Sequence, residues 1–211
     1  MEEEGAWQVA RVVEDSDDGA AGRALAIGDL ELEEQVIDVF IRTTPSTNSA
    51  LRRAMFSVTK ARWNLEPVKL HIQHGLGIKQ GRMLAEQEAE SDPYIFTDDD
   101  VLIVGRDWVA RAVSALKAHP EFGAVSSLSL IEGENLAKGV GEVYEMHAVG
   151  APMIIRKGFM VNLPEMDLGS ECGVIHKFLL EKGYKEGLVN GLRHNHMGHG
   201  FSSNPALFWG Y

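Results

Sequence analysis

Hydrophobic positions in residues 35–211 follow two alternating patterns. Short apolar runs, typical of buried strands, alternate with segments whose apolar residues recur every three or four positions, typical of helices packed on a sheet. Strands are expected at residues 36–41, 68–72, 94–96, 122–128 and 152–155. Helices are expected at residues 51–62, 79–90, 109–116 and 171–182. This order predicts an α/β fold, a single domain with a mostly parallel central sheet flanked by helices.

Two further segments lack such a pattern. Residues 132–150 are polar and Gly-rich, so we expect a loop there. Gly183 is well placed to end the last expected helix. The His-, Asn- and Gly-rich residues that follow Gly183 are interpreted as a tail.

The charge of the chain is concentrated at its beginning. Residues 1–34 hold eleven acids and two arginines, a net charge of −9 out of −11 for the whole chain, which leaves 20 acids against 18 bases elsewhere. These first residues show no sustained hydrophobic period, so we expect an acidic N-terminal arm or hairpin outside a domain at residues 35–211. Because the domain lacks a broad basic surface for phosphates, nucleic-acid binding is not expected.

Composition also bears on the compartment. No stretch approaches the roughly 18 to 20 apolar residues of a membrane-spanning helix, and the acidic first residues differ from the basic start of a signal peptide. The single cysteine, Cys172, excludes an intrachain disulfide. We therefore expect a cytoplasmic protein without a transmembrane segment.

Three adjacent aspartates, Asp98, Asp99 and Asp100, directly follow an expected strand and directly precede the apolar residues 101–104. Ligands of open α/β sheets bind outside the carboxyl ends of the strands, which is where this triplet falls. Adjacent carboxylates repel one another, and Mg²⁺ or Mn²⁺ binds carboxylate oxygens together with substrate phosphates. The apolar segments on both sides favour such a site over an ordinary solvated turn.

Four segments in this order resemble the GT-A glycosyltransferases, most closely the family-2-like nucleotide-sugar transferases. They are a first strand and turn at residues 39–44, a DxD motif at 98–100, an apolar strand with a basic end at 153–157, and a helix with an acidic start and a Gly-aromatic end at 171–184. The similarity covers roughly residues 36–200. It implies a GT-A, Rossmann-like domain that transfers a sugar from a nucleoside-diphosphate sugar to an acceptor, a glycan, lipid or protein, that the sequence does not identify.

The resemblance also implies a donor site. Asp98 would contact the ribose or the sugar, and Asp100 would bind Mn²⁺ or Mg²⁺, which stabilises the charge of the departing diphosphate. The residues implied in nucleotide-sugar binding are Arg42, Thr43, Thr44, Asp98 and, at the middle of the motif, Asp99.

The resemblance also implies that the catalytic base, which deprotonates the acceptor hydroxyl, lies at the start of the last expected helix. Inverting members of the family use the second residue of an acidic pair as catalytic base, and Cys172 occupies that position here. Because a thiol is a poor substitute for a carboxylate base, Glu171 is the candidate base and Asp167 the second candidate. The resemblance favours an inverting hexosyl transfer, although Cys172 leaves the stereochemistry open. Alternatively, Glu171 only complements the helix dipole and Cys172 is a small core residue.

Histidines near the C-terminus provide further candidates. Members of the family supply a histidine from this region to the metal or the diphosphate, and His196 fits that position best, followed by His194. A closed zinc site is not expected because the run lacks a cysteine and a nearby carboxylate. A surface loop in which neither histidine has a role is the alternative.

A glycine-rich segment at residues 75–81 resembles a dinucleotide-binding fingerprint. Its third glycine is one place late, and the strand before it is not the first of the fold, so we expect an ordinary loop. Lys79 within this segment, or Arg82, which follows it, is a candidate for contacting the diphosphate.

Two functions from other classes stay open. A phosphatase of the haloacid dehalogenase type would use Asp98 as nucleophile, although such enzymes carry the motif on the first strand. The small size and the missing second acid would also suit a non-catalytic module that binds a nucleotide-sugar or Ca²⁺. Since few residues remain for an acceptor domain, a partner or a homo-oligomer could complete that site.

Overall fold

The computed structural model describes residues 36–43, 50–63, 67–105, 107–129, 143–145, 150–165 and 171–196. In these residues the helices are α1 (Ala50–Trp63), α2 (Ile78–Glu88), α3 (Trp108–Ala118) and α4 (Glu171–Glu181). The strands are β1 (Ile37–Thr43), β2 (Val68–His74), β3 (Tyr94–Asp98), β4 (Val101–Val104), β5 (Phe122–Ser129), β6 (Val143–Glu145), β7 (Met153–Ile155) and β8 (Lys185–His196).

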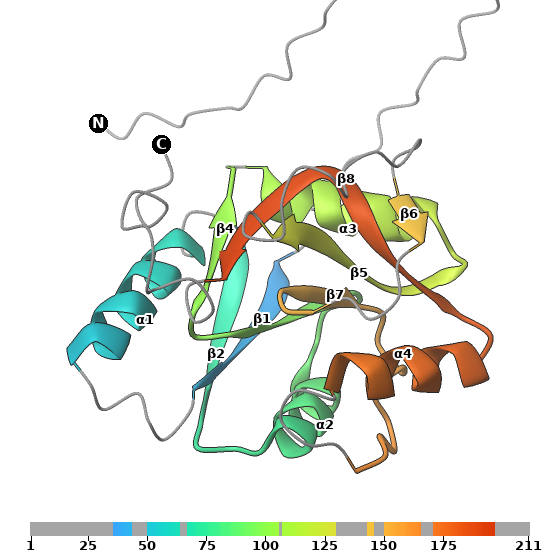
Figure 1. The fold of residues 1–211 in the computed structure, drawn as a ribbon, viewed down its shortest axis with the longest axis horizontal. Coiled ribbons are helices and arrows are strands. Elements are labelled where there is room, and N and C mark those ends of the chain that lie inside the picture. Colours follow the sequence, from blue (N-terminus) through green and yellow to red (C-terminus); the bar gives the residue numbers. More distant parts are fainter. Residues whose placement is uncertain are drawn as a thin grey trace, which may run out of the picture. The chain divides into compact units, whose positions relative to one another are not determined.

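The described strands form one sheet in the order β2-β1-β3-β7-β5-β8-β4, and β6 pairs with β8 (Figure 1). Strand β1 is parallel to β2 and β3, and β5 is parallel to β8, whereas β7, β4 and β6 are antiparallel to their neighbours. Strands β1, β2, β3, β5 and β8 therefore run in one direction. Their C-terminal ends define one side of the sheet, which we call the carboxyl edge.

Helices cover both faces of this sheet, as two separate hydrophobic clusters show. One cluster contains Trp63 of α1 and Trp108 of α3, whose rings meet edge to face with centroids 5.7 Å apart. The other contains Phe40 of β1 together with Ile175 and Leu179 of α4. Strand β1 is buried along its whole length, because successive side chains enter opposite clusters. The predicted α/β domain with a central sheet flanked by helices is confirmed.

Helix α4 ends where the sequence predicts. Gly183 has a φ of +82°, a conformation that a residue without a Cβ adopts readily. The N–H of Gly183 donates to the carbonyl of Leu180 at 2.9 Å, and the N–H of Tyr184 donates to that of Leu179 at 3.0 Å. These bonds close the helix and direct the chain into β8.

Three strands differ from the predictions. The interpretation of the residues after Gly183 as a tail is wrong for β8, which lies between β5 and β4. The glycines and polar residues of β8 interrupt the hydrophobic pattern that predicts a strand, and its polar groups bond to other strands. Strand β4 is only four residues long and directly follows the aspartates, so its sequence shows an apolar segment without a clear strand pattern. Strand β6 lies inside the predicted loop at residues 132–150, most of which lies outside the described residues.

The acidic segment at residues 1–34, and with it the predicted domain boundary, also lies outside the described residues and stays a prediction. Among the helices that the structure describes, none has the length and apolar character needed to span a bilayer.

Candidate functional site

The parallel strands β1 and β3 end side by side and bring two predicted site residues together. Arg42 lies opposite Asp98 in the ladder. The Nε and Nη2 atoms of Arg42 donate to Oδ1 of Asp98 at 2.9 Å and 2.7 Å. Only 8% of the Arg42 side chain and 16% of the Asp98 side chain are exposed, so this is a nearly buried, charge-assisted pair.

The following residues form a turn that is tied to two other elements. We call residues 98–100 the aspartate turn. The N–H of Asp99 donates to the carbonyl of Arg42 at 3.1 Å. From α1, the hydroxyl of Thr59 donates to the carbonyl of Asp99 at 3.3 Å. These bonds fix the turn at the carboxyl edge before any ligand binds, and Asp99 within it is buried.

Strand β8 brings the C-terminal histidines to the same edge. His196 pairs with Val101, the residue that follows Asp100, and His194 pairs with Ile103. His194 is buried, and its Nδ1 lies 2.8 Å from the hydroxyl oxygen of Ser127. The backbone of His196 therefore lies next to the aspartate turn, as a role in that site requires.

Thr43 ends β1, and its hydroxyl contacts the end of β2. The hydroxyl donates to the carbonyl of Gln73 at 3.4 Å and lies 2.9 Å from Nδ1 of His74. Sequence analysis missed His74, although its place at the end of a parallel strand was a usable signal. Thr44, also predicted to line the nucleotide pocket, lies outside the described residues.

Arg82 is the predicted site residue that lies deepest. It is 1% exposed, and its guanidinium carbon lies 4.4 Å from the centre of the Phe96 ring, a cation–π arrangement. One turn later, the carboxylate of Glu86 accepts bonds from the Tyr94 hydroxyl at 3.1 Å and the Met160 N–H at 2.9 Å. Burial, together with the Glu86 carboxylate, raises the pKa of Tyr94 well above its usual range. Contact between Arg82 and a diphosphate stays a prediction.

The basic residues at the end of β7 bind backbone groups of the domain. Nε of Arg156 donates to the carbonyl of Phe122 at 3.0 Å, and its Nη2 donates to the carbonyls of Leu116 and His119, where α3 ends. Cations near a helix C-terminus satisfy its last carbonyls and complement its dipole. In this structure Arg156 thus joins β7 to the end of α3.

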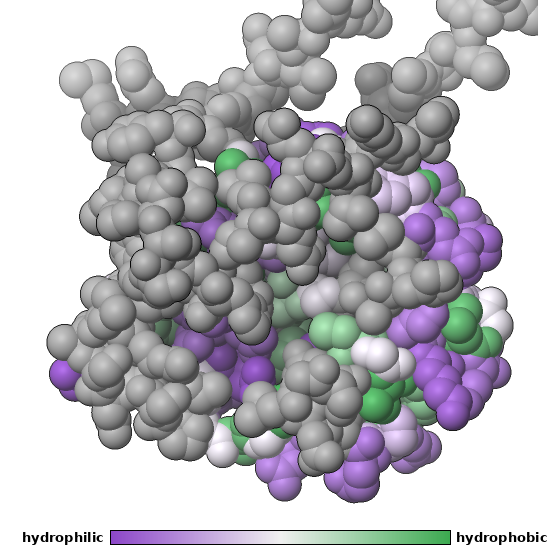
Figure 2. All heavy atoms as spheres, viewed as in Figure 1, coloured by the Kyte–Doolittle hydropathy of each residue, from purple (hydrophilic) through white to green (hydrophobic). Residues whose placement is uncertain are grey.

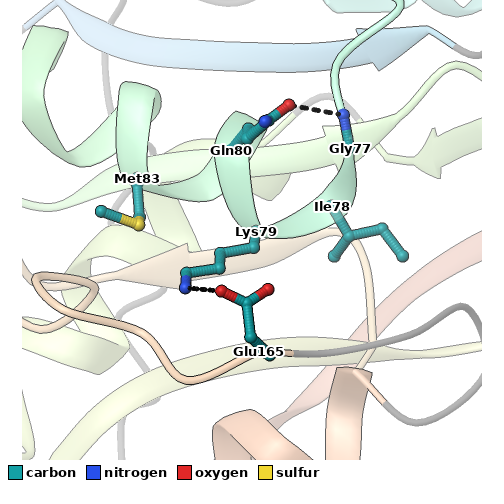
Figure 3. A pocket seen from close by; sticks show the side chains of 6 residues that line it. All are labelled: Gly77, Ile78, Lys79, Gln80, Met83 and Glu165. Atoms are coloured by element: carbon teal, nitrogen blue, oxygen red, sulfur yellow. Dashed lines mark hydrogen bonds and ion pairs between the residues drawn. The ribbon is translucent and has the colours of Figure 1, made fainter.

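An open pocket of about 370 Å³ lies at the start of α2. Nζ of Lys79 forms an ion pair with Oε1 of Glu165, and the N–H of Gly77 donates to Oε1 of Gln80 at 3.4 Å (Figure 3). Because Glu165 balances the charge of Lys79, the pocket is not a ready-made anion site.

The acceptor side is described only in part. Glu171 is the first residue of α4, whereas Asp167 lies outside the described residues. Cys172 is partly exposed, and its sulfur lies 3.8 Å from the place that a Cβ would take on Gly150. Further along α4, Nδ1 of His176 lies 3.0 Å from Oε2 of Glu186, a fully buried carboxylate that sequence analysis missed.

The Asp and His side chains at the carboxyl edge suit a metal ion that binds together with a phosphate-bearing substrate. Within the described ranges, no group of three His, Cys, Asp or Glu side chains could hold a metal ion. Mg²⁺ usually needs only one or two carboxylates and completes its shell with substrate phosphates and water. A carboxylate of the aspartate turn beside β8, which carries His194 and His196, fits this chemistry. The arrangement does not resemble a closed structural metal site. Figure 2 shows hydrophilic residues gathered over β1 and β2, whose ends lie at the carboxyl edge.

Comparison with solved structures finds proteins of similar fold. The mannosyltransferase PcManGT from Pyrobaculum calidifontis, solved with GDP-Man and Mn²⁺, matches with a TM-score of 0.57 at 16% identity over 75% of this chain and 56% of that chain. The inositol-1-phosphate CTP transferase from T. maritima matches with a TM-score of 0.52 at 11% identity over 82% of this chain and 94% of that chain. At these identities the likeness shows the fold, and it confirms the predicted GT-A, Rossmann-like class.

The chain thus spans little more than half of the mannosyltransferase. No protein-family model matches the sequence, and no curated protein matches it.

Proposed function

We propose that this chain is a metal-dependent glycosyltransferase that binds a nucleoside-diphosphate sugar at the carboxyl edge. One observation carries the proposal: the nearly buried Arg42–Asp98 pair holds the aspartate turn at the ends of two parallel strands. Such a preorganised turn needs no rearrangement to receive a charged ligand. The mannosyltransferase neighbour, solved with GDP-Man and Mn²⁺, has the same fold and supports this choice of ligand.

On the donor side, Asp100 and His196, with His194 as a further candidate, would hold Mn²⁺ or Mg²⁺. The cation would stabilise the negative charge that develops on the diphosphate. Arg42 binds Oδ1 of Asp98, so Oδ2 of Asp98 is placed to accept a hydrogen bond from a ribose or sugar hydroxyl. The remaining candidates for the nucleotide pocket are Thr43, Thr44, Arg82 and Asp99.

On the acceptor side, Glu171 or Asp167 would take the proton of the attacking hydroxyl. Glu171 begins α4, where a carboxylate is also stabilised by the helix dipole. Asp167 remains the second candidate. The transfer of a hexose with inversion, and completion of the acceptor site by a second copy of the chain, are part of the same proposal.

A second candidate is nucleotidyl transfer. The inositol-1-phosphate CTP transferase is matched over 94% of its length, whereas the mannosyltransferase is matched over 56%. The size of this domain therefore agrees better with the inositol-1-phosphate CTP transferase. Such an enzyme would join a nucleoside triphosphate to a phosphorylated alcohol and release pyrophosphate.

Product analysis separates these functions. The protein would be incubated with Mn²⁺ and either nucleoside-diphosphate sugars plus glycan, lipid or protein acceptors, or nucleoside triphosphates plus sugar phosphates. Release of a nucleoside diphosphate together with a glycosylated acceptor supports glycosyl transfer, and pyrophosphate supports nucleotidyl transfer. Phosphate release from a sugar phosphate alone would instead indicate the phosphatase. Binding without turnover of any substrate would indicate a non-catalytic module.

A further inference from the structure

Strand β8 contains an irregular segment that changes its neighbours. Along β5, Ser126 pairs with Leu188 and Leu128 pairs with Arg193, so five steps along β8 correspond to two along β5. On its other side, β8 pairs with β6 through residues 187–189 and with β4 through residues 193–196. Residues 190–192 therefore separate the two halves of the strand.

This segment is held by specific contacts. Gly191 has a φ of +77°, and Nη2 of Arg111 donates to the carbonyl of Asn190 at 3.1 Å. Leu192 is 2% exposed and belongs to the hydrophobic cluster beneath α3. Extra residues in a strand change its register and redirect the side chains that follow. The irregular segment thus decides which residue of β8 lies opposite Val101.

A buried hydrogen bond follows the irregular segment directly. The hydroxyl oxygen of Ser127 lies 2.8 Å from Nδ1 of His194, and these residues are 2% and 6% exposed. Ser127 lies between the paired residues Ser126 and Leu128, where the register shifts. His194 lies opposite Ser129 on one side and Ile103 on the other, so the bond joins β8 to β5 two residues before His196.

We propose that Ser127 is a positioning residue for the metal and diphosphate site. Its bond to His194 fixes the last residues of β8 in register and keeps His196 opposite Val101, next to Asp100. In this arrangement His196 is the first candidate ligand, and His194, the second candidate, anchors the backbone that leads to it. The role of His196 as a ligand rests on the proposed function, whereas the fixed register does not.

The test compares two neighbouring buried serines. Ser127→Ala removes the bond to His194. Ser126→Ala is the matched control, because Ser126 is also buried and its hydroxyl donates to the carbonyls of Gly150 at 3.1 Å and Pro152 at 2.6 Å. The first readout is backbone amide hydrogen exchange in the metal-free protein. Exchange at residues 193–196 should rise at least about tenfold in Ser127→Ala and stay unchanged in Ser126→Ala.

The second readout is Mn²⁺ affinity, measured by electron paramagnetic resonance with GDP or UDP present. Loss of a residue that orients a metal ligand typically lowers affinity about 10- to 100-fold, so this loss is expected for Ser127→Ala alone. A purely structural serine would lower stability without changing the Mn²⁺ affinity of the folded protein. If Ser127→Ala does not fold, Ser127→Cys, whose thiol bonds weakly, provides the same comparison.

The outcomes separate the two proposals. Unchanged exchange at residues 193–196 in Ser127→Ala would overturn the positioning role. Unchanged Mn²⁺ affinity in that variant, with normal binding by the wild type, would overturn it too. Failure of the wild-type protein to bind Mn²⁺ with any nucleotide would overturn the proposed function and the ligand role of His196, while the exchange data would still decide whether Ser127 fixes the register.

Discussion

Removing one partner of the Arg42–Asp98 pair should strongly destabilise the fold, because only 8% and 16% of the two side chains are exposed and the remaining charge would be left nearly buried. Arg42→Met keeps a long apolar side chain but leaves the Asp98 carboxylate without two hydrogen bonds. Removing one partner of a fully buried pair costs about 3–5 kcal/mol, whereas exposed pairs contribute at most about 1 kcal/mol. Since Asp98 keeps some hydration, we expect a loss of about 2–4 kcal/mol. Urea unfolding followed by the fluorescence of the buried Trp63 and Trp108 would measure it.

A second ion pair on the same sheet supplies the control. Lys69 of β2 and Glu90 lie 3.0 Å apart, but 48% and 78% of their side chains are exposed. Lys69→Met should therefore change the free energy of unfolding much less than Arg42→Met. Adding Asp98→Asn to Arg42→Met should recover part of the loss, because it removes the unpaired charge. Equal effects of Arg42→Met and Lys69→Met would refute the reasoning.

Two further predictions concern stability. Burial opposes ionisation of Asp38, but hydrogen bonds from His71 and two backbone amides outweigh it and lower the pKa of Asp38. The stability that this carboxylate contributes should be complete above about pH 5 and decline as the pH falls below about 4; a wild-type advantage over Asp38→Asn that does not shrink there in urea unfolding would contradict this. Gly81→Ala would place a Cβ 2.9 Å from Oε1 of Gln73, a buried side chain whose amide donates to the Gly81 carbonyl, so this crowding should offset the roughly 1 kcal/mol that alanine gains over glycine in a helix; Gly173→Ala, where the new Cβ meets open space, should keep that gain. Similar unfolding midpoints for these two variants would exclude overpacking at Gly81.

Elements with a clear hydrophobic period could be predicted from the sequence. The strand expected at residues 36–41 is β1, and the helix expected at 171–182 is α4, within one or two residues at each end. Both carry apolar residues at the spacing that their buried faces need. Strand β8 could not be predicted in this way, because its polar residues bond to partners that are distant in the sequence. The Ser127–His194 bond joins residues 67 positions apart, which no local pattern reveals.

The candidate site was predictable only in part for the same reason. The place of the aspartates at the carboxyl end of a strand followed from the order of apolar segments. Their partner did not, because Arg42 and Asp98 are 56 positions apart and meet only through the register of β1 and β3. Burial was equally hard to predict. Arg82 is a candidate for contacting the diphosphate from its sequence position, but its guanidinium lies over Phe96 in the interior.

Binding of nucleotides in the presence and absence of Mn²⁺ tests the central claim most directly. UDP, GDP, CMP and TDP would be titrated by calorimetry into the wild type, Asp100→Ala and Asp107→Ala. Asp107 is a suitable control because its side chain is 66% exposed and it lies beyond the other end of β4. The account predicts Mn²⁺-dependent binding of one nucleotide that is lost in Asp100→Ala and kept in Asp107→Ala. Absence of binding across the whole panel, or binding that Asp100→Ala leaves unchanged, would contradict it.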